Sequence, residues 1–314
     1  MHSDRWLWLG ATLVALGCSD PVADPPKTDA GKADVVVVDD AGVDAPVVTP
    51  DADTDAGDGA VAPAWQCSPT ASWISPKAVG VSGTGVFGAI TADETSIAWI
   101  TSKTLHWADR SLATDPWGAE ATVTLPTLAS TRLAISASGL RVILVVDSGK
   151  NLGELTRASK TDAFVGPPDS TLYKPIAFAL SEAPPAALVD DPVLAQDETH
   201  LYFTLALPNA SSTLRESSLG DGGMTWALGT ALSQTELAPQ AGSLRRPTGI
   251  SSDRLTLFYW DEVDSAEHAA FRTSDANDFS VFVGLGAKPG GQVDGTCTRL
   301  YYGVPAGFEY ATRQ

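Results

Sequence analysis

The chain has 314 residues and a formal charge of −18, from 38 acidic and 20 basic side chains, with only 3 Cys, 4 His and 2 Met. Because such an acidic chain repels phosphate backbones, we expect no nucleic-acid partner. Three cysteines are too few for a disulfide scaffold, and no two histidines have metal-ligand spacing. We therefore expect neither a metal nor a cofactor.

Residues 1–18 have the pattern of an export signal. Trp6–Gly17 is an apolar run of twelve residues, which is too short to span a bilayer and typical of the hydrophobic core of a signal peptide. The last three residues of this run and the cysteine that follows, Ala15–Cys18, resemble a bacterial lipobox. The resemblance implies that Cys18 is lipidated and becomes the new N-terminus, and Ser19 after it favours the outer membrane. An ordinary signal peptide cut beside this cysteine is the alternative.

Residues 19–64 are predicted to be a disordered tether. They hold eleven Asp against two Lys, a net charge of −9, and no aromatic residue. Such a segment cannot bury enough apolar area to offset the entropy of ordering. Its 46 residues would reach about 37–41 Å as a flexible coil. Asp51–Asp58 resembles the start of a calcium loop, but Ala62 stands where a bidentate Glu is needed, so solvated linker charge is the preferred interpretation.

From Trp65 onward, aromatic residues appear throughout and one motif recurs five times. Each copy reads as a strand, a tight turn and a second strand, with alternating β-branched and aromatic residues. The copies begin at Ile90, Ile135, Leu194, Ile250 and Val293. Their spacings of 43 to 59 residues are typical of four-stranded propeller blades, in which we expect an aromatic residue to open the outer strand. The aromatic residues in question are Trp117, Phe164, Trp226 and Phe279.

The fifth unit stops after its third strand, which would leave an exposed sheet edge. Trp73–Val79 matches Trp117–Val123 at the aromatic residue and the final valine. We therefore predict that this N-terminal strand completes the last blade and closes a ring of five. Cys67 precedes that strand and Cys297 lies in the last unit, so a disulfide between them would fasten the two ends. Two buried free thiols are the alternative.

These units resemble TolB-type propeller repeats, through turn-and-strand elements such as Gln196–Asp197, Arg-x-Ser elements, and Asp-x-Trp/Phe elements such as Asp115–Trp117. In particular they resemble the propeller lipoproteins common in myxobacteria, which join such repeats to an Asp-rich tether. The resemblance covers the lipobox and residues 65–314. It implies a β-propeller at the cell envelope, although the family's Ser-Pro-Asp-Gly turn is nowhere intact.

Propellers bind ligands at the mouth of their central channel, on the loops that lead into each innermost strand. The longest such insertion is Val165–Asp191, and an acidic loop begins at Asp261. The candidate binding rim consists of Tyr173, Lys174, Arg245, Arg246, Asp261 and Glu262. The competing interpretation is that these loops are tolerated insertions.

A degenerate sialidase-like glycoside hydrolase is the enzymatic alternative. Asp221–Trp226 resembles the Asp-box of sialidase-like propellers, which is itself a structural turn. Such a site also needs an arginine cluster, and the candidates are Arg132, Arg245, Arg246 and Tyr173. Their spacing does not show that they converge, so we assign no catalytic residue.

We therefore predict three parts: a lipoprotein signal at 1–18, a tether at 19–64, and an all-β, five-bladed propeller at 65–314. The predicted protein is a monomeric, non-enzymatic outer-membrane lipoprotein, on the periplasmic or the surface face. Its propeller would bind an unknown protein or glycan. A TolB-like role in envelope assembly is a further alternative.

Overall fold

A computed structural model describes most of the chain from Trp65 onward. The described ranges are 65–84, 86–125, 128–149, 151–166, 174–178, 187–206, 212–219, 225–226, 229–232, 244–288 and 290–314. The predicted signal, Cys18 and the tether lie outside them. Within these ranges the structure is built from strands, and its one helical element is the short 3-10 turn η1 (Asp147–Gly149).

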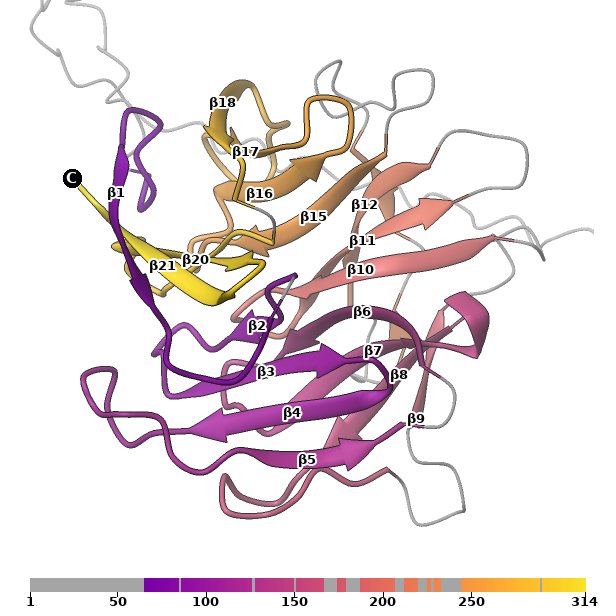
Figure 1. Ribbon diagram of the computed structural model, residues 1–314. Helices are drawn as coiled ribbons and strands as arrows, with labels where there is room; N and C mark the ends of the chain where they lie inside the picture. Colours follow the sequence, from indigo (N-terminus) through magenta and orange to yellow (C-terminus); the bar gives the residue numbers. More distant parts are fainter. Residues whose placement is uncertain are drawn as a thin grey trace, which may run out of the picture. The chain divides into compact units, whose positions relative to one another are not determined.

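The strands form five antiparallel sheets around a common centre (Figure 1). Blade 1 contains β2 (Ala89–Ile90), β3 (Ser96–Thr101), β4 (Thr104–Asp109) and β5 (Ala121–Thr124), and blade 2 contains β6 (Leu128–Ile135), β7 (Arg141–Val146), β8 (Asn151–Thr156) and β9 (Lys174–Phe178). Blade 3 contains β10 (Leu188–Leu194), β11 (His200–Ala206), β12 (Thr213–Ser218) and β14 (Thr230–Ala231), and blade 4 contains β15 (Arg245–Ile250), β16 (Thr256–Asp261), β17 (Ala266–Phe271) and β18 (Val281–Gly286). Blade 5 contains β19 (Gln292–Val293), β20 (Arg299–Val304), β21 (Gly307–Arg313) and β1 (Trp73–Ala78).

The core consists of five hydrophobic clusters, one between each pair of neighbouring blades. Because successive side chains of a strand point to opposite faces, the middle strands contribute to two clusters at once. In β3, Ile97 and Trp99 pack between blades 5 and 1, whereas Ala98 and Ile100 pack between blades 1 and 2. The cluster between blades 5 and 1 closes the ring, so the predicted five-bladed propeller is confirmed.

The repeated turns are held by the aspartates that the sequence singled out. Asp93, Asp197 and Asp253 each accept a hydrogen bond at 2.9–3.0 Å from the backbone N–H two residues further on. The next residue has a positive φ in every blade, a conformation that favours glycine. These residues are Glu94 (φ 58°), Gly139 (71°), Glu198 (56°), Arg254 (59°) and Cys297 (54°). Only blade 2 keeps glycine there.

The N-terminal strand closes the last blade as predicted. Strand β1 pairs antiparallel with β21, from Trp73 opposite Arg313 to Ala78 opposite Glu309 (Figure 1). Cys67 and Cys297 form a disulfide that joins positions 230 residues apart. Just before it, the Trp65 indole N–H donates to the carbonyl of Arg272 in blade 4 at 2.7 Å. The beginning and the end of the domain are therefore fastened both covalently and by strand pairing.

Two local expectations differ from the structure. The insertion Val165–Asp191 is not one loop, because β9 lies inside it and β10 includes Asp190 and Asp191. Trp226 does not open the outer strand of blade 3. It lies in β13 (Thr225–Trp226), which pairs in parallel with β9 and becomes a fifth strand of the blade 2 sheet. Its indole is buried in the cluster between blades 2 and 3, which explains why an aromatic residue recurs at this point of the repeat.

Candidate functional site: the charged end of the central channel

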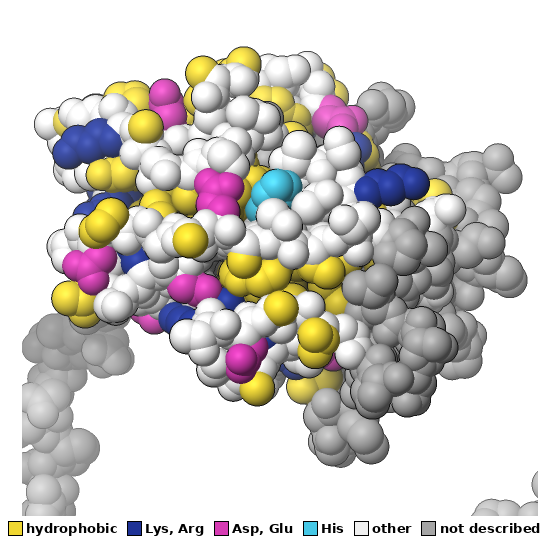
Figure 2. Space-filling view, turned by 60° about the horizontal axis from the view of Figure 1, so that its bottom comes forward, with side chains coloured by type: hydrophobic (Ala, Val, Ile, Leu, Met, Phe, Trp, Pro, Cys, Tyr) yellow, Lys and Arg dark blue, Asp and Glu magenta, His cyan; other side chains and the backbone are white. Residues whose placement is uncertain are grey.

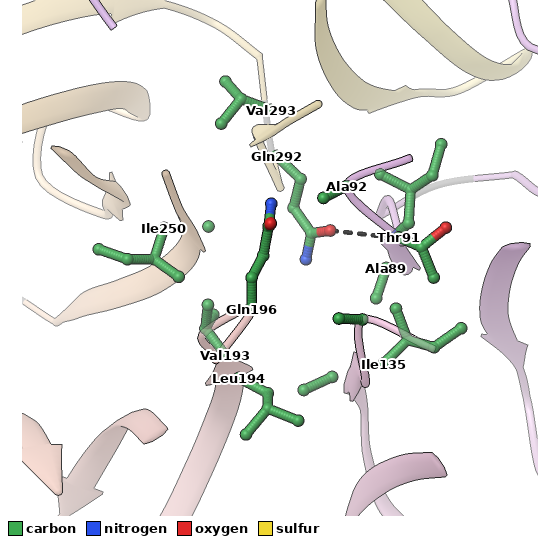
Figure 3. Close-up of a pocket in the computed structure, with 14 residues that line it drawn as sticks. Ala89, Thr91, Ala92, Ile135, Val193, Leu194, Gln196, Ile250, Gln292 and Val293 are labelled. Carbon is green, nitrogen blue, oxygen red and sulfur yellow. Dashed lines mark hydrogen bonds between the residues drawn. The ribbon is translucent and has the colours of Figure 1, made fainter. Parts of the chain in front are cut away.

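The innermost strands of all five blades line a narrow central channel (Figure 3). Its walls are mostly aliphatic, with Ile135, Leu194 and Ile250 among them. The amides of Gln196 and Gln292 extend into the lumen, and Gln292 accepts a hydrogen bond from the Ile90 N–H at 3.0 Å. The cavity has a volume of about 40 Å³, enough for a few waters but not for a sugar or a peptide. A sugar or a peptide therefore cannot bind within the lumen, and the ends of the channel are the places where the propeller axis could meet one.

Charged side chains gather where the innermost strands begin, opposite to the repeated turns. We call Arg132, Asp190, Asp191, Arg246 and Glu262 the charged cluster. They come from blades 2, 3 and 4, and all but Glu262 belong to the innermost strands β6, β10 and β15. On each of these three strands the charged residues precede the residues that line the aliphatic lumen. The cluster therefore forms a charged layer next to the aliphatic one.

Asp191 is the centre of the charged cluster. Its carboxylate lies 3.6 Å from Nε of Arg132 and 3.1 Å from Nη1 of Arg246. Arginines of blades 2 and 4 therefore both contact a carboxylate of blade 3. Arg246 also reaches Asp190 at 3.2 Å and Glu262 at 2.8 Å. Thr204 donates a further hydrogen bond to Asp191 at 3.3 Å. The arginines required by the sialidase-like alternative thus converge in part, since Arg132 and Arg246 share one carboxylate.

Irregular backbone places these side chains. Three strand pairs shift register beside these residues. The pairing of β6 with β7 shifts next to Arg132, that of β10 with β11 next to Asp191, and that of β15 with β16 at Thr248. A β-bulge bends its strand and turns a side chain to a new direction. Asp191 also has a φ of 51°, which a residue other than glycine seldom adopts. Such conformations are concentrated at binding and catalytic sites.

The cluster has a buried part and an accessible part. Asp191 is 1% exposed, and burial raises its pKa from 3.8 to about 6 against the opposing effect of Arg132. Its Oδ1 atom is buried without a hydrogen-bond partner. The side chains of Arg246, Asp190 and Glu262 are 24%, 37% and 42% exposed. Asp191 and Arg132 therefore support an accessible Asp190–Arg246–Glu262 triad.

A second buried carboxyl lies at the same level in blade 4. Glu267 is fully buried, which raises its pKa to about 8, and it is bonded by the hydroxyl of Thr248 and by the backbone N–H groups of Gly290 and Gly291. Its Oε2 atom is buried without a hydrogen-bond partner. Arg132 of blade 2 also acts electrostatically on Glu267. Burial therefore favours the protonated form of Glu267 at neutral pH.

The structure joins four of the six predicted rim residues in two ion pairs. Arg246 contacts Glu262, and Arg245, its neighbour in β15, pairs with Asp261 at 2.9 Å in a nearly buried ion pair. Lys174 is not with them. It is the first residue of β9, the outermost of the four antiparallel strands of blade 2, and it pairs with Glu154 of β8. Tyr173 lies outside the described residues, as do the first four residues of the Asp-box match.

Sequence reasoning missed the role of Asp190, Asp191 and Glu267. The first two ended the insertion Val165–Asp191 and the third ended the acidic loop that begins at Asp261. Both loops were placed at the binding rim, but none of these three residues was nominated. One signal was present. Asp191 precedes Pro192 and comes three residues before Leu194, where the recurring turn unit of blade 3 begins. Two adjacent carboxylates therefore interrupt an otherwise apolar innermost strand.

On the face drawn in Figure 2, acidic and basic side chains are scattered among neutral ones. Within the described ranges, no three His, Cys, Asp or Glu side chains are grouped so that they could hold a metal ion. No helix in the same ranges has the length and hydrophobicity needed to cross a membrane.

Comparison with known proteins gives structural likeness only. No family model and no curated protein matches the chain. Similar solved structures include TolB from Acinetobacter baumannii (12% identity, 76% of this chain and 57% of that chain, TM-score 0.44). They also include a luciferin-regenerating enzyme (14%, 73% and 72%, 0.46) and a regucalcin from Agrobacterium tumefaciens (14%, 73% and 70%, 0.42). The chain spans little more than half of the TolB structure. The β-propeller fold expected from the TolB-type repeats is established by the five sheets themselves.

Proposed function

We propose that this chain is an exported, membrane-anchored lipoprotein whose monomeric propeller binds a glycan or protein partner at the charged cluster. The observation that carries the proposal is the convergence of Arg132 and Arg246, from two different blades, on the buried carboxylate of Asp191. A buried polar atom left without a hydrogen bond costs about 1–3 kcal/mol. Two such atoms, Oδ1 of Asp191 and Oε2 of Glu267, lie at this level of the channel and support a role in recognition there.

The chemistry of the cluster indicates the kind of partner. Carboxylates of Asp190 and Glu262 flank the single accessible guanidinium of Arg246. Carboxylates accept hydrogen bonds, and glycan hydroxyls and protein amines donate them. A partner rich in hydrogen-bond donors, neutral or basic, therefore suits this site better than an acidic one.

The binding proposal is tested by Arg246→Gln. We expect this substitution to weaken partner binding at least tenfold, because it removes the group that joins Asp190, Asp191 and Glu262. The matched control is Arg141→Gln, since Arg141 has a similar exposure of 25% and also holds two ion pairs, with Glu154 and Glu198, at the turn end. The measurements are binding of the full chain to a glycan array, and crosslinking on intact cells followed by partner identification. Equal binding by both variants would contradict the proposal.

Membrane anchoring has its own test. The lipobox resemblance at Cys18 and the disulfide, which forms in oxidising compartments, both support export. Two or more acyl chains anchor a protein stably where one does not. We expect Cys18→Ser to abolish palmitate labelling and to release the protein from the membrane fraction, with the outer membrane as the wild-type location. Labelling that persists in this variant would refute the lipoprotein assignment.

A hydrolase is the second candidate, favoured by one observation. Asp191 and Glu267 are two buried carboxyls with pKa values of about 6 and about 8, and pairs of this kind can serve as base and acid. However, Glu267 is 0% and Asp191 1% exposed, and the lumen is too narrow to bring a substrate to either. Hydrolysis of a glycoside by the wild type, lost in both Asp191→Asn and Glu267→Gln, would reverse this preference.

A further inference from the structure

A pocket separate from the channel lies on the seam where blade 5 meets blade 1. It is lined by the end of β1, by the loop between β4 and β5, and by β20 and β21. Its volume is about 270 Å³, just below the usual range for pockets that bind drug-sized ligands. We propose that this pocket binds a small carboxylate whose body has a flat or apolar face.

The charge of the pocket favours an anion. Arg110 and Arg299 both line it, and both contact the same buried carboxylate, that of Glu94. Glu94 also accepts a hydrogen bond from the Tyr301 hydroxyl at 2.5 Å. The charged residues that line the pocket are both arginines, so it presents positive charge in an otherwise acidic protein.

Arg299 is the group best placed to meet the ligand. Its side chain is 29% exposed, compared with 10% for Arg110. Its contacts with Glu94 and Tyr301 do not engage all five N–H donors of a guanidinium. A planar guanidinium presents paired donors that match the two oxygens of a carboxylate.

Aromatic rings supply the rest of the lining. The Arg110 guanidinium lies 4.1 Å from the centre of the Trp117 ring, and that of Arg299 lies 5.3 Å from the centre of the Tyr310 ring. Stacking of this kind holds a guanidinium plane in a fixed orientation. Trp117, Tyr301 and Tyr310 also offer ring surface to the body of a ligand. The site therefore combines a fixed cation with an aromatic wall.

Two other seams contain an acid that is absent at this one. In blade 2, Arg157 forms a two-bond ion pair with Asp109 of blade 1, both bonds at 2.7 Å. In blade 4, Arg272 does the same with Glu216 of blade 3, at 2.8 and 3.0 Å. Glu216 stands opposite Tyr202 in the strand register of its sheet.

Arg110 is the corresponding arginine of blade 1, but blade 5 offers it no such acid. Tyr310 stands opposite Tyr301, at the register position that Glu216 occupies in blade 3. Among the described residues, Arg110 forms an ion pair with Glu94 of its own blade alone, at 3.6 Å, and its other hydrogen bonds go to the backbone carbonyls of Glu94 and Asp115. The carboxylate that fills the equivalent seams from within the protein is missing here, and a ligand carboxylate would take its place.

An acidic sugar and the carboxyl end of a peptide share this chemistry, and two probes distinguish them. Binding of D-glucuronate and of N-acetyl-phenylalanine to the full chain is measured by calorimetry, with glucose and N-acetyl-phenylalaninamide as uncharged counterparts. We expect saturable binding at one site for at least one carboxylate, and binding at least tenfold weaker for its uncharged counterpart. The probe that binds identifies the source.

Two variants and one control test the location. Arg299→Gln should weaken binding of that probe at least tenfold. Tyr310→Glu should abolish it, because it supplies from within the protein the acid that the other seams contain. Arg254→Gln is the control, since Arg254 is 18% exposed and holds ion pairs with Asp197 and Asp275 elsewhere. No saturable binding of either carboxylate, equal binding of the uncharged counterpart, or binding unchanged in both variants would overturn the proposal.

Discussion

Replacing Cys67 and Cys297 together by serine is expected to lower the melting temperature by about 10–20 °C. The disulfide closes a loop of 230 residues, for which the chain-entropy model gives about 5 kcal/mol. In a domain of this size, each kcal/mol shifts the melting temperature by about 2–4 °C. Both cysteines are also buried in the cluster between blades 4 and 5, so the serine hydroxyls add a further penalty there.

The measurement is thermal unfolding with and without a reducing agent. The wild type should lose the same stability on reduction, whereas the double variant should not respond to it. Deleting residues 65–80 should cost more than the double substitution, because it also removes β1 and exposes the edge of β21. A deletion variant that melts at the wild-type temperature would refute closure by the N-terminal strand.

Glu267→Gln is expected to make the propeller more stable at alkaline pH than the wild type. Burial raises the pKa of Glu267 from 4.5 to about 8, so the folded protein holds this proton at pH values where the unfolded chain has released it. Wild-type stability therefore falls as the pH rises from about 4.5 to about 8, and it stays constant above that range as far as Glu267 is concerned. The loss is on the order of 3–5 kcal/mol.

Glutamine keeps the shape of the side chain and a carbonyl oxygen for Thr248, Gly290 and Gly291, but it carries no titratable proton. The variant should therefore show a flat free energy of unfolding between pH 7 and 9, measured by urea titration. This window lies above most of the titration of Asp191, whose pKa is about 6. Glu120→Gln, at an exposed position, is the control and should retain the wild-type slope. A slope retained in Glu267→Gln would contradict the buried-acid assignment.

The sequence was sufficient to predict the parts of the fold that repeat. Ile97 to Ile100 alternate between two blade interfaces, and this alternation is visible as a period of two in every copy of the motif. The closing strand and the Cys67–Cys297 disulfide could be predicted because the last unit lacks its outer strand. The blade pattern is repeated five times, and the closing strand matches one copy of its outer strand. A single sequence therefore contains enough information to predict both.

The charged cluster could be predicted only in part because it depends on departures from the repeat. Arg246 and Glu262 were nominated from their expected loop level, and they are in contact. Asp191 was not nominated, because a register shift and a positive φ turn its side chain toward Arg132. Lys174 was placed with the rim although β9 carries it to the outer side of blade 2. Side-chain direction at a bulge has no periodic signature in the sequence.

The position of Cys67 has a mechanical consequence for a protein held by its N-terminal side. Any tension transmitted through residues 1–64 enters the propeller at Trp65–Cys67, before β1 begins. The disulfide carries that load directly into blade 5 at Cys297, so the hydrogen bonds between β1 and β21 are not pulled apart one after another. The closing strand is thereby shielded from force applied through the N-terminal segment until the disulfide is reduced.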